Sequence, residues 1–462
     1  MKDQRQRLAE QPIPRLLFDL SVPATVGMAT MAFYILADTI FVGRGVGALG
    51  IAGMTVVFPL MTLLLGLGQL LGIGGGSLIS RALGSGRMED AERCLGNLLV
   101  LVALAYLLIC LPVVWFSDPL LRAFGADGQV LVLAEQYMKI VVGGGFFHIF
   151  NVTSNNVIRS QGHAKVAMLS MVLGALINLA LDPILIFGFG MGMRGAAVAT
   201  VLGNLGMTLY VLRYFLGGGS LVAIRASCLG LRRAVVREIM AVGFSSFVRQ
   251  SSGSLMVLLA NRLLVFHGGD QALAMFGILH RLLMFCLMPI FGIIHGMMPI
   301  VGFNYGAGDY RRARETIGLA VKSTTILTGG TFLLFMTMPR LLTLMFTDEP
   351  ELLAMSSMVL RIGVLGAPTI GFQFVTAGMY QALGRARPAL ILSLARQVLF
   401  LIPMLLLLPR WFGVFGVWFS LPLADFAASG LTYFMFRAEI GRLHHRHGPS
   451  IAQFDSGAAG RQ

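Results

Sequence analysis

Charged residues are scarce in this sequence. Of its 462 residues only 12% are Asp, Glu, Lys or Arg, whereas 56% are hydrophobic. A soluble globular chain carries about 25% charged residues, because it has to cover its surface with them. The composition therefore excludes an ordinary soluble protein, and the mean hydropathy of +0.80 indicates that a bilayer is the solvent.

Cysteine is rare as well, and the first residues do not have the pattern expected of a cleavable signal peptide. The cysteines Cys94, Cys110, Cys228 and Cys286 lie far apart, without a Cys-X-X-Cys pair or the spacing of a metal site. We interpret them as packing residues. The start, MKDQRQRLAEQPIPRLL, is charged and leads into a full-length apolar run with no small-residue cleavage site, so we expect it to remain in the cytoplasm.

Apolar stretches long enough to cross a bilayer recur along nearly the whole chain. The hydrocarbon core of a membrane is about 30 Å thick, which requires roughly 20 apolar residues in a helix. We predict an all-α integral membrane protein with twelve such spans. They cover residues 16–41, 50–76, 95–116, 129–157, 166–189, 195–216, 238–265, 272–299, 317–338, 352–380, 389–409 and 413–436.

Basic residues gather in every second break between these spans. Arg87, Arg159 and Arg312 are examples, whereas the other breaks hold acids such as Asp127 and Glu349. Loops rich in Lys and Arg remain in the cytoplasm, so the pattern predicts that both termini are cytoplasmic. The net charge of +14 requires no nucleic-acid partner, because anionic lipid and the membrane potential account for basic breaks.

The two halves of the chain repeat each other. LGSGRMEDA at 83–91 recurs as YGAGDYRRA at 305–313, 222 residues further on, and the same offset pairs Gly74 with Gly296. Six spans per half is an even number, so both halves enter the membrane from the same side as parallel repeats. We predict an N-terminal six-helix lobe at 1–216, a cytoplasmic linker at 217–237, a C-terminal lobe at 238–440 and a disordered cytoplasmic tail at 441–462.

Duplicated lobes favour a transporter. Two lobes that rock against each other can open a central cavity first to one side of the membrane and then to the other, which is alternating access. A membrane-embedded enzyme would need a nucleophile, a base or a metal set, and the sequence offers no such constellation. We therefore expect no enzymatic activity.

Two acidic residues interrupt the apolar spans of the first half. A charge at the centre of a bilayer costs about 2.5–3.5 kcal/mol on insertion scales, so Asp38 and Asp182 are functional candidates. Asn178 lies four residues before Asp182 and shares its helix face. Two nearby carboxylates suit a bound cation, either a proton or Na⁺, although a helix cap or a distant arginine is the structural alternative. Thr200 could add a hydroxyl oxygen.

The second half carries arginines and amides at membrane depth. Arg249 with Gln250, and Arg396 with Gln397, interrupt two of its spans. Such residues either line a water-filled path or balance a carboxylate, and we keep all four as possible substrate residues of the cavity.

Taken together, several motifs resemble the MATE family, the multidrug and toxic compound extrusion transporters. The resemblance covers residues 14–440 and rests on these segments: Ala37-Asp38-Thr39, LGSGRMEDAER, SQGHAK, NLALDP, FNYGAGDYRRAR and ALGRARP. It implies two six-helix lobes in a V-shaped fold. It also implies export of cationic amphiphilic compounds in exchange for H⁺ or Na⁺, with no other cofactor.

The resemblance also assigns roles to residues. Asp38, Asn178, Asp182 and Thr200 match the cation site of the DinF-like branch, with Tyr34 beside them, and these oxygens would be the metal ligands if the ion is Na⁺. Pro23 matches the proline at which the first helix of the family bends. The segment at 247–250 resembles MepA-like members of this group.

The expected function is a secondary active multidrug antiporter of a bacterial cytoplasmic (inner) membrane. Its partners would be small organic cations and the lipid bilayer, and we expect a monomer. The alternatives are a flippase for lipid-linked precursors, or an exporter of narrow substrate range, from the same superfamily.

Overall fold

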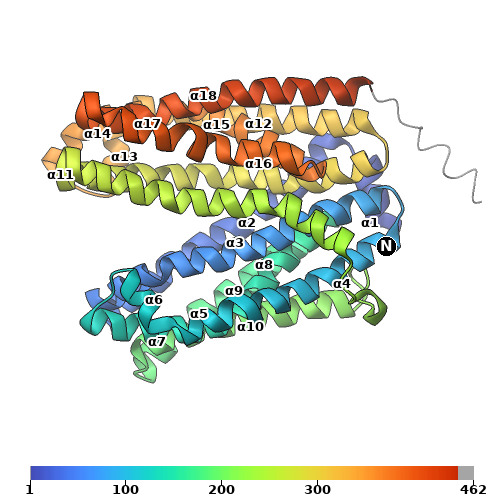
Figure 1. Cartoon of the computed structure of the whole chain (residues 1–462), viewed down its shortest axis with the longest axis horizontal. Coiled ribbons are helices and arrows are strands. Elements are labelled where there is room, and N and C mark those ends of the chain that lie inside the picture. The colour runs from blue at the N-terminus through green and yellow to red at the C-terminus, as the bar shows by residue number, and fades with distance from the viewer. Residues whose placement is uncertain (1, 446–462) are drawn as a thin grey trace, which may run out of the picture. The chain divides into compact units, whose positions relative to one another are not determined.

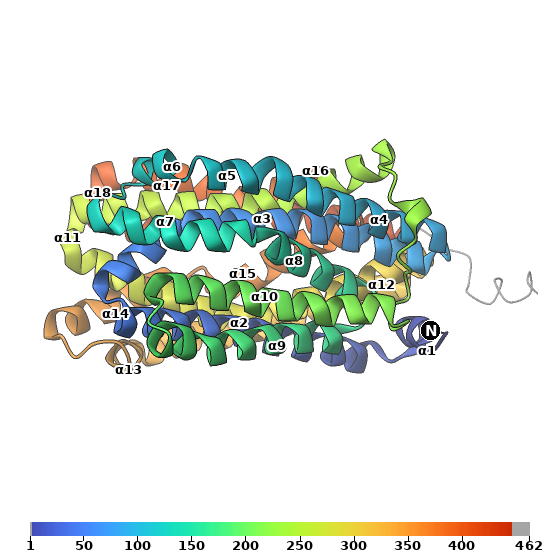
Figure 2. The same cartoon turned by 90° about the horizontal axis from the view of Figure 1, so that it is seen from below.

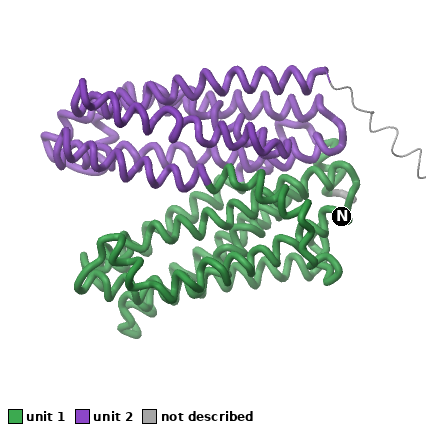
Figure 3. The backbone as a smooth tube through the Cα atoms, in the orientation of Figure 1, with its two compact units in different colours: residues 1–10, 23–247 green, residues 11–22, 248–462 purple. Residues whose placement is uncertain are grey.

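The structure, a computed structural model, describes residues 2–445, and every regular element within them is helical (Figure 1). The chain folds into two compact units, drawn in two colours in Figure 3. Unit 1 comprises residues 2–10 and 23–247, and unit 2 comprises residues 11–22 and 248–445.

Unit 1 holds most helices of the first half. Within it α3 packs against α8, and α9 packs against α10, and Figure 2 shows α9 and α10 lying side by side. The elements of this half are α1 (Lys2–Glu10), α2 (Ile13–Gly45), α3 (Ala48–Gly84), α4 (Met88–Ala105), η1 (Tyr106–Cys110), α5 (Leu111–Trp115), α6 (Ser117–Ala123), α7 (Gly128–Gly143), α8 (Gly145–Ser160), α9 (Ala164–Pro183), η2 (Ile184–Gly188), α10 (Gly192–Leu216) and η3 (Ala226–Cys228).

Unit 2 is built in the same way, with α12 packed against α15 and α15 against α18. The elements of the second half are α11 (Arg233–Gly306), α12 (Tyr310–Thr337), α13 (Pro339–Leu344), α14 (Pro350–Val364), α15 (Ala367–Ala382), α16 (Ala386–Leu394), η4 (Ala395–Leu401), α17 (Ile402–Leu407) and α18 (Pro409–His445).

The described residues contain ten helices that are long and apolar enough to cross a membrane, and the bent pair α7 and α8 adds an eleventh span. One of the ten, α11, has 74 residues, far more than the roughly 20 that a bilayer requires. It consists of two helices that meet at Gly269, where φ is 68° and the backbone is not helical. Counted in this way the spans number twelve, in the order that the hydropathy predicts.

Large apolar side chains remain exposed on both units. Trp115 is 84% exposed and Phe266 is 82% exposed, and Phe434 is similar. In a water-soluble monomer such side chains would form aggregation-prone patches. On a protein whose surface meets lipid tails they carry no such penalty, and the fold is therefore that of an integral membrane protein.

The backbone repeats with the offset found in the sequence. Left-handed glycines pair at 222 residues: Gly47 with Gly269, Gly86 with Gly308, and Gly162 with Gly384. The turns match in their hydrogen bonds as well, since Arg87 N donates to Ala82 O and Asp309 N donates to Asn304 O, both at 2.9 Å. Equivalent loops of the two halves therefore have the same conformation.

The units differ from the predicted lobes at their boundaries. Residues 11–22, which open the first half, belong to unit 2, while the start of α11 up to Phe247 belongs to unit 1. Both segments open a repeat, because the offset of 222 places Ser21 opposite Gly243. The boundary between the units thus lies about 30 residues beyond the predicted end of the first lobe at 216.

Close backbone contacts hold these opening segments in place. In unit 1, a Cβ atom on Gly243 would lie 1.8 Å from Leu70 O, and one on Gly74 would lie 2.0 Å from Ile239 O. In unit 2, a Cβ atom on Gly296 would lie 2.4 Å from the Ser21 hydroxyl. Small residues at helix crossings allow such approach in membranes, so each opening segment packs against the unit that holds most of the other repeat.

The structure describes residues 2–10 at one end of the chain, and only the first residues of the predicted tail at the other. Residues 441–445 continue α18, and the remainder of the predicted tail at 441–462 lies outside the described residues. At the other end α1 is anchored to unit 1, because Gln4 donates to Gly162 O at 2.8 Å and Arg5 donates to Leu83 O at 2.9 Å.

Candidate functional site

Two acids of unit 1 lie on neighbouring helices with their carboxyl groups buried. Asp38 belongs to α2 and is 4% exposed, and Asp182 belongs to α9 and is fully buried. The two carboxyl groups lie within hydrogen-bonding reach of each other. Within the described part of the chain, Asp38 Oδ1 has no hydrogen-bond partner, so one carboxylate oxygen remains available for a cation.

Asn178 links this acid pair to α10. It lies one turn before Asp182 on α9, which places both side chains on one face. With its amide in the orientation that satisfies both ends, Asn178 donates to Asp182 Oδ2 at 3.2 Å and accepts from the Thr200 backbone N–H at 3.3 Å. The structure therefore brings Asp38, Asn178, Asp182 and Thr200 together in unit 1.

Tyr137 of α7 also belongs to this group, and the sequence analysis did not single it out. It is 5% exposed, and it lies beside the Thr200 side chain. Tyr34 and Tyr137 both lie close to the carboxyl groups of Asp38 and Asp182. The available signal was a tyrosine inside a predicted span, because a buried tyrosine hydroxyl usually finds a partner.

Asparagine side chains brace the same helices behind the acids. Asn204 lies one turn after Thr200 and donates to Thr200 O at 2.9 Å. Asn151 of α8 donates to Asn204 O at 2.8 Å and accepts from the Thr208 hydroxyl at 3.0 Å. These bonds fix α10 against α8, so Thr200 is held in a constant position relative to the acids.

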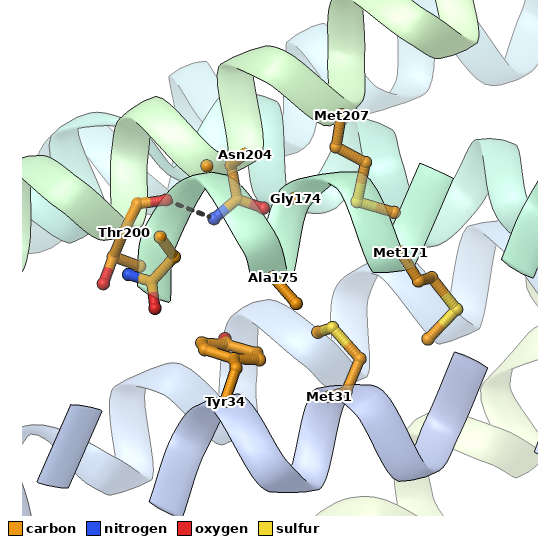
Figure 4. Close-up of a pocket in the computed structure, with 10 residues that line it drawn as sticks. Met31, Tyr34, Met171, Gly174, Ala175, Thr200, Asn204 and Met207 are labelled. Carbon is orange, nitrogen blue, oxygen red and sulfur yellow. Dashed lines mark hydrogen bonds between the residues drawn. The ribbon is translucent and has the colours of Figure 1, made fainter. Parts of the chain in front are cut away.

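A pocket adjoins the acid pair. It is a small pocket, open on one side, with room inside for about one water molecule. Figure 4 shows Met31, Met171 and Met207 at one end and Tyr34 and Thr200 at the other. Its lining also includes Gly174, Ala175, Asn178, Gly203 and Asn204. Methionine is flexible and polarizable, so this end can adapt to ligands of different shape.

The arrangement is suited to binding one small cation. Two carboxylates at close range in a medium of low dielectric repel each other, and a proton or a metal cation relieves that repulsion. Among the described residues no group of three or more His, Cys, Asp or Glu side chains could hold a metal ion. A Na⁺ ion would therefore need the neutral oxygens of Asn178 and Thr200 beside the two acids.

Pro23 lies inside α2 at the residue where this helix passes from unit 2 to unit 1. Proline removes a backbone donor and weakens the helix next to it. The position is therefore a mechanically weak point, between the segment 11–22 and the part of α2 that carries Tyr34 and Asp38.

The polar residues of unit 2 fall into two groups. Arg396 Nε pairs with Asp425 Oδ1 at 2.5 Å, and Asp425 is 2% exposed. Gln373 donates to Asp425 O at 3.0 Å, which ties the ion pair to α15. The first group is thus an ion pair whose carboxylate is buried. Arg249, Gln250 and Gln397 make up the second group, and they are half-buried.

The chain matches known proteins along nearly its whole length. The family model described as MatE matches residues 23–184 and 241–407. The Multidrug export protein MepA of Staphylococcus aureus (strain MSSA476) is 27% identical over 431 residues, which are 92% of this chain and 94% of that protein. A solved outward-facing multidrug resistance MATE family transporter of the MOP superfamily has a TM-score of 0.89 at 26% identity, over 95% of this chain and 98% of that one. A solved chain described as protein A is 41% identical, with a TM-score of 0.87 over 94% and 97% of the two chains.

Proposed function

The chain belongs to the MatE family, and from that premise we propose that it exports several kinds of small organic cation across the membrane in exchange for H⁺ or Na⁺. Relatives that share about a quarter of its residues over nearly their whole length are named multidrug export proteins. Because the match extends over both halves, the transport machinery of those relatives has a counterpart throughout this chain.

The observation that carries the proposal is the acid pair of Asp38 and Asp182 beside a pocket with a flexible methionine end. The pair supplies a binding site for a coupling cation. The methionines Met31, Met171 and Met207 supply an adaptable apolar surface for varied compounds. Tyr34 and Thr200 line the pocket near the pair, so the ion and the exported compound bind close to each other.

Coupling follows if the ion and the exported compound favour different states of the transporter. A cation that binds the Asp38 and Asp182 pair in the outward-open state neutralises it, and α2 then rearranges at Pro23 so that the bound compound leaves. In the inward-open state the cation is lost to the cytoplasm and a new compound binds. A ligand with equal affinity for both states would shift nothing, so the difference in affinity is what drives export.

We propose the remaining properties on the same basis. The protein acts as a monomer in a bacterial cytoplasmic membrane, with both termini in the cytoplasm, because the basic breaks between spans favour that orientation. It needs no organic cofactor and no nucleic acid, and it catalyses no covalent chemistry.

The alternative within the superfamily is a flippase for lipid-linked precursors. Such a protein would gather cationic side chains around a phosphate. In unit 2 Arg396 already pairs with Asp425 and Arg262 is exposed, which leaves Arg249 on its own and not in a dense cluster of free cations. The alternative is therefore kept as an outcome of the transport test.

Transport in reconstituted liposomes tests the proposal. We would load ethidium and impose a pH gradient and a Na⁺ gradient separately, for the wild type and for Asp38→Asn. We expect one gradient to drive export in the wild type and neither to do so in the variant. Absence of transport of several cationic dyes under both gradients, with folded protein, would favour the flippase or a narrow-substrate exporter.

A further inference from the structure

Two arginines that lie at membrane depth in unit 2 differ in their partners. Arg396 forms its ion pair with the buried carboxylate of Asp425. Arg249 forms no ion pair and no hydrogen bond with any residue between 2 and 445, and its guanidinium lies over the face of Phe374, with the guanidinium carbon 5.9 Å from the ring centroid. A half-buried guanidinium without an anion is costly at this depth.

The surroundings of Arg249 are aromatic. Phe374 of α15 packs edge to face against Phe291 of α11, with ring centroids 5.1 Å apart. A cation over such a ring gains about 0.5–2 kcal/mol, which is less than a carboxylate would supply. The aromatic pair therefore positions the guanidinium but does not neutralise it.

A second unsatisfied polar group lies one helical turn away. Gly253 follows Arg249 by four residues and so shares its face of α11. A Cβ atom on Gly253 would lie 3.3 Å from Gln397 Nε2, so the Gln397 amide rests on this bare stretch of helix. Gln397 Oε1 is buried, and within the described residues the amide makes no hydrogen bond. Arg249 and the Gln397 amide therefore lie near one face of α11, and neither side chain has a hydrogen-bond partner among the described residues.

We propose that Arg249 and Gln397 bind a carboxylate carried by an aromatic export substrate, with Phe374 as the apolar floor of the site. The inference rests on the proposed function, and it assigns the residues that recognise the carboxylate of a compound that carries one. A guanidinium offers two parallel donors that match the two oxygens of a carboxylate, and the amide N–H₂ can donate a further bond. Phe374 can stack on the aromatic part of the same compound.

The phosphate of a lipid headgroup offers similar oxyanion chemistry from a different source. A lipid would occupy Arg249 regardless of the exported compound, whereas a substrate carboxylate makes the arginine matter only for compounds that carry one. A lipid phosphate and a substrate carboxylate can therefore be distinguished by whether the effect of Arg249 depends on a carboxylate in the compound.

The test uses two xanthene dyes that differ by one ester. Rhodamine 110 carries a free carboxylate, and rhodamine 123 is its methyl ester. Binding to the purified full-length protein is measured by fluorescence anisotropy, which needs no ion gradient, for the wild type, Arg249→Gln, Arg249→Lys and Gln397→Leu. Arg262→Gln is the matched control, because Arg262 is an exposed arginine of the same helix.

We expect Arg249→Gln to raise the Kd for rhodamine 110 by about tenfold or more, the size expected for a charge-assisted hydrogen-bonded pair. The Kd for rhodamine 123 should change by less than about twofold, since dispersion and stacking remain. Arg249→Lys should recover only part of the loss, because it keeps the charge without the fork. Gln397→Leu should weaken rhodamine 110 binding selectively but less, and Arg262→Gln should change neither dye.

Equal weakening of both dyes by Arg249→Gln, or weakening of neither, would overturn the carboxylate site. Retention of anionic phosphatidylglycerol by the purified wild type, lost in Arg249→Gln without any discrimination between the dyes, would assign the site to a lipid phosphate instead. Failure of the proposed export function is a separate result: the wild type would then transport neither dye in liposomes, while the anisotropy comparison would still decide the role of Arg249.

Discussion

The carboxyl groups of Asp38 and Asp182 meet inside unit 1, although they come from α2 and α9 and lie far apart in the sequence. Asn178 then connects Asp182 with the backbone of Thr200 on α10. Any movement of α2 at Pro23 would change the distance between the two acids, so the affinity for a cation and the position of α2 depend on each other.

Asp38→Asn and Asp182→Asn should each abolish gradient-driven dye export. Each substitution removes one negative charge, so the pair no longer requires a cation, while a similar volume is kept. Export is measured in proteoliposomes as dye movement after a gradient is imposed, and it should fall to the rate of empty liposomes. Asp118→Asn is the control, since the Asp118 side chain is half exposed and its surface ion pair with Arg122 contributes little. Full export by either buried variant would contradict the acid pair as the coupling site.

Tyr137→Phe should weaken the binding of the coupling ion without destabilising the fold. It removes the hydroxyl that lies beside the Thr200 side chain, and loss of one polar contact is worth about 1 kcal/mol, or roughly fivefold in affinity. We would measure export against Na⁺ concentration or pH, and expect the half-maximal point to shift by about that factor. Tyr106→Phe is the matched control. The Tyr106 hydroxyl donates to Gly143 O at 2.8 Å and is not part of the site that holds the two acids. An equal shift in the control would show that any lost tyrosine bond has this effect.

The ion pair of Arg396 and Asp425 should act on stability. Removal of one partner of a buried ion pair costs about 3–5 kcal/mol, because the other charge is left alone. Arg396→Met and Asp425→Leu should therefore each lower the thermal midpoint in detergent clearly. The double variant should recover most of the loss. The ion pair would not be the main role of Arg396 if the double variant were as unstable as the single ones. If the single variants altered dye selectivity at unchanged stability, the result would favour a role for Arg396 in substrate binding.

Gly243→Ala should disrupt unit 1. Its Cβ atom would lie 1.8 Å from Leu70 O, so two helix backbones must move apart, at a cost of about 1–3 kcal/mol or more. Folded yield and thermal midpoint in detergent measure the effect. Gly277→Ala is the control, since among the described residues nothing lies within 4 Å of its added Cβ atom. If the two variants behave alike, the crossing of α3 and α11 is not tight.

Much of the fold could be predicted because lipid imposes a simple requirement. Each span must satisfy its own backbone hydrogen bonds in a helix about as long as the bilayer is thick, so hydropathy alone locates the spans. The all-helical membrane fold is confirmed, and left-handed glycines such as Gly86 and Gly308 carry the repeat into the backbone. The boundaries of the units were not predictable in this way, because hydropathy does not record which unit the segment 11–22 packs against.

The candidate site was partly predictable, since a buried charge is costly and therefore conspicuous. Asp38 and Asp182 stand out in apolar spans, and the four-residue spacing places Asn178 beside Asp182. Tyr137 was not predicted as a site residue, because a tyrosine is common in such spans. Only the fold shows that it lies beside Thr200. The two arginines could not be told apart in the sequence, because the partner of Arg396 lies on another helix, at Asp425.

Because of the opening segments of the two repeats, a cut in the linker does not divide the chain into its two compact units. A chain cut in the linker at 217–237 would leave residues 11–22 in one fragment and their packing partner Gly296 in the other. Residues up to Phe247 would likewise be separated from Leu70. Neither fragment is a complete folding unit by itself.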